Sequence, residues 1–105
     1  MDLTKFDAKL DKWAADETIA AEKAQLSGDE RARSIALMKK NMYLTMLKTL
    51  GHNAPHALKS CYSDLENRQK KQLALGDIDA ADRISIQLAC IRQVQDLILE
   101  LGGSI

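Results

Sequence analysis

The sequence predicts an all-α protein, an antiparallel four-helix up-down bundle made of two αα-hairpins. Apolar residues recur every three or four positions along four segments, the spacing that places them on one side of a helix. Gly28, Gly51 and Gly76 separate these segments, and glycine commonly ends helices in the left-handed conformation. Because such short connections make consecutive helices antiparallel neighbours, the bundle either closes within one chain or is completed by dimerisation.

Length and composition agree with this fold class. A chain of 105 residues is expected to form a single domain over residues 1–105. Its 46% hydrophobic and 29% charged residues are typical of a globular protein. One proline is too few for a β-sandwich, which turns every ~8–12 residues.

The first helix is expected at about residues 4–27. Its apolar stripe begins with Phe6, Leu10 and Trp13 and continues mainly with alanines, which would let another helix approach closely. Thr4 is a plausible N-cap residue for it, although Asp2 competes for that role, because each side chain can accept a hydrogen bond from a free backbone N–H group.

The second helix is expected at about residues 30–50, with Asp29 as its cap. Methionines at every fourth position, Met38, Met42 and Met46, form its stripe. A methionine stripe either packs in a core or offers an adaptable surface to a peptide. Both interpretations stay open for this helix.

The third helix is expected at about residues 55–75 and the fourth at about residues 78–101. Pro55 suits a first helical turn, where no backbone N–H group is needed. Residues 66–72 of the third helix are polar on all sides. Asp77 or Asp79 is expected to begin the fourth helix, and residues 102–105 to form a frayed tail.

The fourth helix has more apolar surface than an ordinary surface helix. At about 100° per residue its apolar residues form two stripes that together span roughly 220° of the helix. The helix is therefore either the most buried one of a monomer or the interface with another chain. We interpret its second stripe as a protein interface, formed by Ile86, Cys90, Val94, Leu97 and Leu101.

The charges sum to zero but are unevenly distributed along the chain. Residues 29–75 have more bases than acids, whereas residues 1–28 and 76–105 have more acids. Either neighbouring helices attract one another, or a basic ridge binds nucleic acid or another anionic partner. The ridge would comprise Arg31, Arg33, Lys39, Lys40, Arg68, Lys70 and Lys71. Nucleic acid is the less favoured partner, because no aromatic platform or recognition helix accompanies these residues.

No catalytic, cofactor-binding or metal site is expected, so the sequence predicts a protein that is not an enzyme. His56, Ser60 and Asp64 lie on one line of the third helix, but a triad needs the histidine in the middle. His52, His56 and Cys61 would supply only three metal ligands, where a structural zinc site has four. No small-molecule substrate is evident.

The sequence therefore predicts a protein-interaction or regulatory module, most simply a homodimer. It is expected in the cytoplasm, since no stretch reaches the ~18–20 apolar residues of a membrane span and no secretory signal begins the chain. Cys61 and Cys90 are expected to be reduced and buried, although a disulfide between them would also fit their heights in a hairpin.

The two hairpins also look alike at an offset of 48 residues. The matching pairs are Leu10 and Leu58, Asp16 and Asp64, Gly28 and Gly76, Asp29 and Asp77, and Ala32 and Ala80. Either an ancestral hairpin was duplicated, or two unrelated hairpins obey the same capping rules, which is the simpler interpretation.

Overall fold

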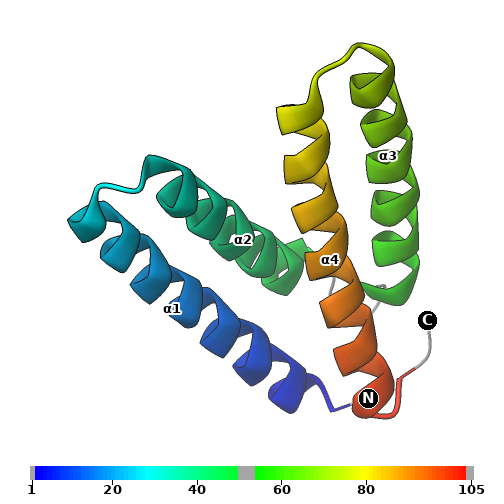
Figure 1. Ribbon diagram of the computed structural model, residues 1–105. Coiled ribbons are helices and arrows are strands. Elements are labelled where there is room, and N and C mark those ends of the chain that lie inside the picture. Colours follow the sequence, from blue (N-terminus) through cyan, green and yellow to red (C-terminus); the bar gives the residue numbers. More distant parts are fainter. Residues whose placement is uncertain (1, 50–53, 104–105) are drawn as a thin grey trace. The chain divides into compact units, whose positions relative to one another are not determined.

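The structure, a computed structural model, describes residues 2–49 and 54–103 and is all-helical within them (Figure 1). It contains four helices, α1 (Leu3–Ser27), α2 (Glu30–Thr49), α3 (Ala54–Ala74) and α4 (Ile78–Glu100), and no strand in those residues. Each described end lies within one residue of the expected position. The expected end of the second helix at Leu50, and Gly51 after it, lie outside the described residues.

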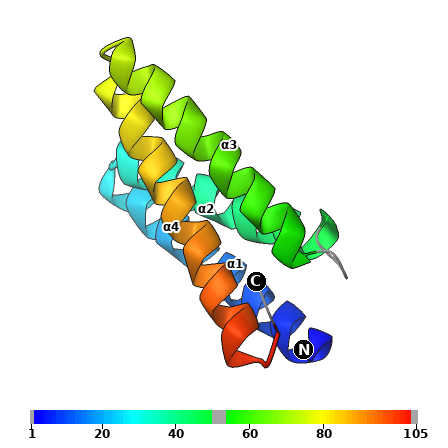
Figure 2. The same ribbon diagram turned by 90° about the vertical axis from the view of Figure 1, so that its right-hand side faces the viewer.

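The chain divides into two compact units, residues 2–51 and residues 52–105. In one unit α1 packs along α2, which we call the first hairpin, and in the other α3 packs along α4, which we call the second hairpin (Figures 1 and 2). The all-α class is therefore confirmed. The joining of both hairpins into one up-down bundle and one domain stays a prediction.

The turn of the first hairpin is fixed by Gly28 and Asp29. Gly28 has a φ of 76°, and its N–H donates to the carbonyl of Gln25 over 3.2 Å. The Asp29 N–H donates to the carbonyl of Ala24 over 2.9 Å, so the end of α1 is closed by a Schellman motif. The Asp29 carboxylate then accepts from the Ala32 N–H over 3.0 Å and caps α2, as predicted.

Two contacts fix the register of α1 on α2. The Trp13 and Tyr43 rings lie 5.6 Å apart between centroids and are tilted by 51°. Glu17 pairs with Lys39 over 3.0 Å. Both pairs are centred on position 28, so the two helices run in opposite directions from the turn at Gly28.

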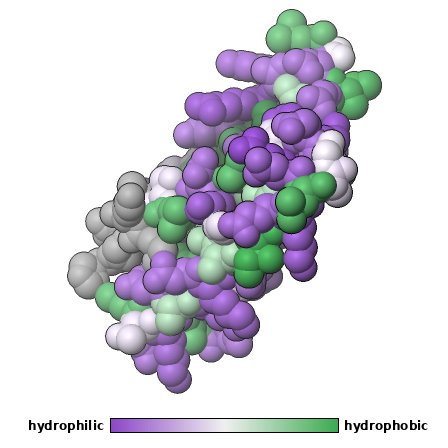
Figure 3. All heavy atoms as spheres, turned by 90° about the vertical axis from the view of Figure 1, so that its left-hand side faces the viewer, coloured by the Kyte–Doolittle hydropathy of each residue, from purple (hydrophilic) through white to green (hydrophobic). Residues whose placement is uncertain are grey.

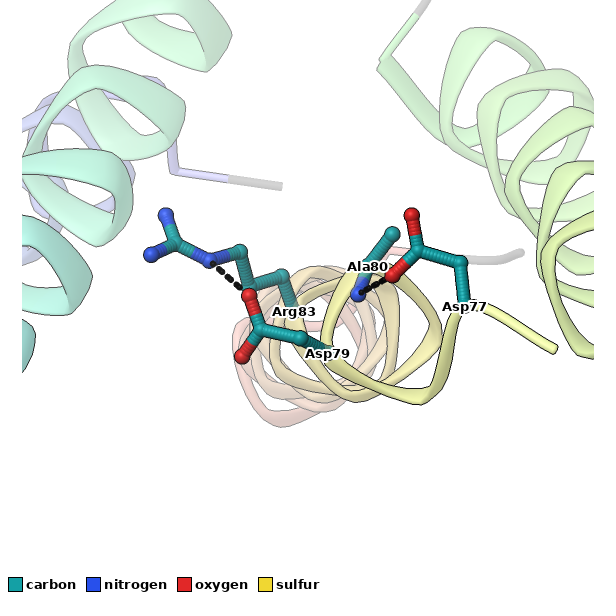
Figure 4. A network of polar contacts seen from close by, with 4 residues as sticks. All are labelled: Asp77, Asp79, Ala80 and Arg83. Carbon is teal, nitrogen blue, oxygen red and sulfur yellow. Dashed lines mark hydrogen bonds and ion pairs between the residues drawn. The ribbon is translucent and has the colours of Figure 1, made fainter.

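The turn of the second hairpin repeats the same arrangement around Gly76 and Asp77. Gly76 has a φ of 78°, and its N–H donates to the Leu73 carbonyl over 3.1 Å. The Asp77 N–H donates to the Gln72 carbonyl over 2.9 Å. The Asp77 carboxylate accepts from the Ala80 N–H over 3.1 Å, which makes Asp77 the cap of α4 (Figure 4). Asp79 instead pairs with Arg83 one turn later, over 3.5 Å.

The register of α3 on α4 is also symmetric about its turn. The Gln69 amide donates to the Ala81 carbonyl over 3.1 Å and also to the Ser85 hydroxyl. Further from the turn, the Arg92 guanidinium donates to the Tyr62 hydroxyl over 3.0 Å. Gln69 and Ser85, like Tyr62 and Arg92, are equally distant from Asp77, so this hairpin too is antiparallel.

Both outer helix ends are capped. The Asp2 carboxylate accepts from the N–H groups of Thr4 and Lys5, over 3.0 and 3.2 Å, so Asp2 and not Thr4 is the N-cap of α1. After α4, Gly102 has a φ of 87° and the Gly103 N–H donates to the Ile98 carbonyl over 2.8 Å. The expectation of fraying was therefore wrong for these two glycines, because together they close the helix.

Candidate functional site

The predicted interface stripe of α4 is largely covered within this chain. Cys90, Val94 and Leu97 are only 2%, 0% and 5% exposed, while Ile86 and Leu101 at the two ends are half-buried. A partner that uses the three middle side chains must therefore replace the groups that cover them. The two end positions are open to a partner without any rearrangement.

This stripe does not face α3. The α4 residues that contact α3 through hydrogen bonds, Ala81, Ser85 and Arg92, lie within about 40° of one another around the helix axis. At the same angular step, the stripe from Ile86 to Leu101 is centred roughly opposite to them. Packing against α3 therefore leaves this side of α4 for another part of a protein to cover.

The methionine stripe of α2 is only partly withdrawn from solvent. Met46 is buried, whereas Met38 and Met42 are half-buried. Leu37 and Leu44, which lie off that stripe, are half-buried as well. These exposures fit a helix whose apolar side is covered unevenly, and both interpretations of the stripe stay open.

The cations of the predicted basic ridge do not form one line. Arg31 and Arg33 are about 200° apart around α2, so they point to different sides of that helix. Lys39 is held by Glu17 on α1, which fits the alternative that neighbouring helices attract each other. Lys40 is half-buried on α2, and the exposed members Arg68, Lys70 and Lys71 belong to the other compact unit. The ridge as a single binding surface stays a prediction.

The side chains considered for catalysis or metal binding are not gathered into a site. His56, Ser60 and Asp64 are all exposed along α3, and His56 and Asp64 are separated by about 12 Å of helix axis. Among the described residues, no group of three histidine, cysteine or acidic side chains could hold a metal ion. His52 lies outside the described part of the chain.

Cys61 and Cys90 form no disulfide with each other and lie in different environments. Cys90 is buried, but Cys61 is exposed, so the expectation of two buried thiols was wrong for Cys61. The geometry of α4 explains why they do not pair. Cys90 lies on the side of α4 opposite to Ser85 and Arg92, the residues that contact α3. A similar height in the hairpin is therefore not enough to bring the two sulfur atoms together.

A polar contact between α3 and α4 was missed in the sequence. The Arg92 guanidinium lies 5.1 Å from the centre of the Tyr62 ring and donates to its hydroxyl. That hydrogen bond is the main cause that raises the pKa of Arg92. The available signal was position: Tyr62 and Arg92 lie equally far from Asp77 on opposite sides of the turn.

A second missed feature is a group of exposed apolar side chains at the turn of the second hairpin. Leu73, Leu75 and Ile78 are 55%, 78% and 73% exposed. Apolar side chains are visible at the upper end of Figure 3, the end at which Figure 1 places the turn between α3 and α4. The helical pattern hid these residues, because Leu73 and Leu75 look like the last apolar positions of a buried stripe.

Comparisons with known proteins add no relative to these observations. No helix in the described ranges combines the length and the apolar character needed to cross a membrane. No family model, no curated protein and no solved structure matches the chain.

Proposed function

We propose that this chain is a non-enzymatic protein-interaction or regulatory module of the cytoplasm that acts through the α4 stripe. The observation that supports the proposal best is the position of this stripe. It lies roughly opposite to the side of α4 that hydrogen-bonds to α3, yet it is as apolar as a core surface. An apolar helix side that the other helix of its hairpin does not cover packs either within the chain or against another chain, and the proposal takes the second case.

A second copy of the chain is the partner that we propose for the stripe. Closed two-fold dimers are the commonest soluble oligomers, and they place the same surface of both copies in contact. Ile86 and Leu101, half-buried at the two ends of the stripe, would make the first contacts. The middle residues Cys90, Val94 and Leu97 would follow as the side chains over them are replaced.

The decisive measurement is the solution mass at micromolar concentration, by size-exclusion chromatography with light scattering. We expect a mass near twice 11.7 kDa for the unaltered chain. The double variant Ile86→Gln and Leu101→Gln should be a monomer with unchanged helical content. Half-buried positions serve this test better than Val94, which is 0% exposed, because a charge at Val94 would unfold the chain even if it made no interface.

A matched control is available on the same helix. Leu99 is 49% exposed and lies about 180° from the stripe, so Leu99→Gln should leave the mass at the dimer value. A monomeric unaltered chain would contradict the proposed homodimer. A dimer that persists in the Ile86→Gln and Leu101→Gln variant would show that copies meet through another surface.

A further inference from the structure

The first hairpin is an internal control for the exposed apolar residues at the second turn. At an offset of 48, Leu73, Leu75 and Ile78 correspond to Gln25, Ser27 and Glu30. The backbone closes in the same way at both turns, with the same two hydrogen bonds to the end of the preceding helix. Since polar residues at these positions support the turn of the first hairpin, the turn itself does not require the apolar ones.

The charges beside the second turn are sorted by helix. Residues 68–74 at the end of α3 contain three bases and no acid, and residues 77–83 at the start of α4 contain three acids and one base. The corresponding residues 20–26 and 29–35 of the first hairpin have one acid and one base, and two acids and two bases. The second turn is therefore basic along one helix and acidic along the other, and the first turn is mixed.

The helix dipole explains only part of this separation. It favours bases in the last turn of a helix and acids in the first, and it fades beyond those turns. Lys71 and Asp79 lie within these turns. Arg68, Lys70 and Asp82 lie outside them. The helix dipole therefore does not account for the charges at these three positions.

We propose that this end of the second hairpin, with Leu73, Leu75 and Ile78 as its apolar residues, binds the same end of a second copy. In a two-fold contact each surface meets itself, so the bases of α3 in one copy would face the acids of α4 in the other. The apolar side chains would then lie between the two sets of ion pairs. An anionic membrane surface or a nucleic acid fits less well, because its negative charge would repel Asp77, Asp79 and Asp82.

The size of this surface indicates a weak contact. Three partly exposed side chains offer on the order of a few hundred Å², below the roughly 800 Å² per partner of a standard stable interface. We therefore expect association at concentrations above those at which the α4 stripe is proposed to pair. This surface is separate from the stripe, and its use does not depend on the function proposed above.

Sedimentation equilibrium from about 10 µM to about 1 mM tests the proposal. The average mass of the unaltered chain should rise with concentration across this range. Replacing the three apolar residues by their counterparts from the first hairpin, as Leu73→Gln, Leu75→Ser and Ile78→Glu, should abolish the rise. The control Leu26→Gln removes an 89% exposed leucine beside the other turn and should leave the rise unchanged.

A charge exchange tests the two-fold geometry directly. Lys71→Glu and Asp82→Lys should each weaken self-association several-fold, because each variant places like charges opposite one another twice. An equal mixture of the two variants should restore the rise of the average mass with concentration. In the mixed dimer each contact between positions 71 and 82 again joins a base to an acid. Circular dichroism checks that both variants stay helical.

Three results would overturn the proposal. These are a constant mass up to about 1 mM, a rise that survives the triple substitution, and a mixture that associates no better than its components. The Ile86→Gln and Leu101→Gln variant separates this proposal from the function proposed above. It changes only the two end residues of the stripe and keeps the second turn, so its mass should still rise with concentration even when it is monomeric at micromolar concentration.

Discussion

The first hairpin turns at Gly28 and the second at Gly76, and the two turns are built in the same way. Both glycines are left-handed, with φ values of 76° and 78°, and both are followed by an aspartate that caps the next helix. The helix contacts beyond the turns differ. The first hairpin has an aromatic pair and an ion pair, whereas the second has a glutamine bridge and an arginine–tyrosine contact.

This difference separates what the fold needs from what it tolerates. A glycine–aspartate pair closes one helix and caps the next, whatever the neighbouring side chains are. The residues around the pair are therefore free to vary. They are polar at Ser27 and Glu30 and apolar at Leu75 and Ile78. Residues that vary between two equal turns are better guides to function than those that the turns share.

Truncating a buried leucine of each hairpin is expected to have the largest effect on stability, and it tests whether the two leucines are equivalent. Leu10 and Leu58 correspond at the offset of 48 and are 0% and 1% exposed. Leu10→Ala and Leu58→Ala should each lower the free energy of unfolding by about 2–5 kcal/mol, because each leaves a cavity in a packed core. Urea denaturation followed by circular dichroism measures both values.

The control for these variants is Leu26→Ala, since Leu26 is 89% exposed and its truncation should change stability by less than about 0.5 kcal/mol. A loss below about 1 kcal/mol for only one of the two core variants would break the equivalence. It would show that one hairpin collapses around the missing side chain and the other does not.

The helices and turns of this fold follow from local sequence signals. Glycine in the left-handed conformation and aspartate at the N-cap act over four or five residues, so a linear pattern is enough to find them. The choice of Asp2 over Thr4 was not predictable in this way, because both can cap a helix. It depends on which side chain reaches the N–H groups of Thr4 and Lys5.

The candidate surfaces were less predictable, because burial depends on contacts between distant residues. The arc of apolar residues on α4 is visible in the sequence, but the full burial of Val94 and the exposure of Cys61 are not. Leu75 fits the helical pattern and yet is 78% exposed, since α3 ends one residue before it. Periodicity identifies the side of a helix, and only the fold shows what covers it.

Alanine substitutions at the two turn glycines are expected to have a smaller effect on stability, and they test whether a side chain strains both turns equally. At both glycines an added Cβ atom would meet no atom within 4 Å, so only the backbone conformation opposes it. Gly28→Ala and Gly76→Ala should therefore cost similar amounts, about 1–2 kcal/mol each. Thermal unfolding of the two variants measures this. A difference above about 1 kcal/mol would mean that one turn has a constraint that the shared hydrogen bonds do not explain.

The smallest effects on stability are expected from substitutions in the polar contacts that join the helices of each hairpin, and they compare these contacts. Lys39→Met removes the ion pair with Glu17. The two side chains are 32% and 17% exposed, so the loss should cost at most about 1 kcal/mol at low salt and less at 1 M salt.

Tyr62→Phe removes the acceptor of the Arg92 hydrogen bond but keeps the ring beneath the guanidinium. Its small cost should not change with salt, because the lost partner is neutral. Urea denaturation at both salt concentrations measures the two losses. A salt-dependent loss in Tyr62→Phe would instead indicate that Arg92 is held mainly by nearby acidic groups such as Asp96 and Glu66.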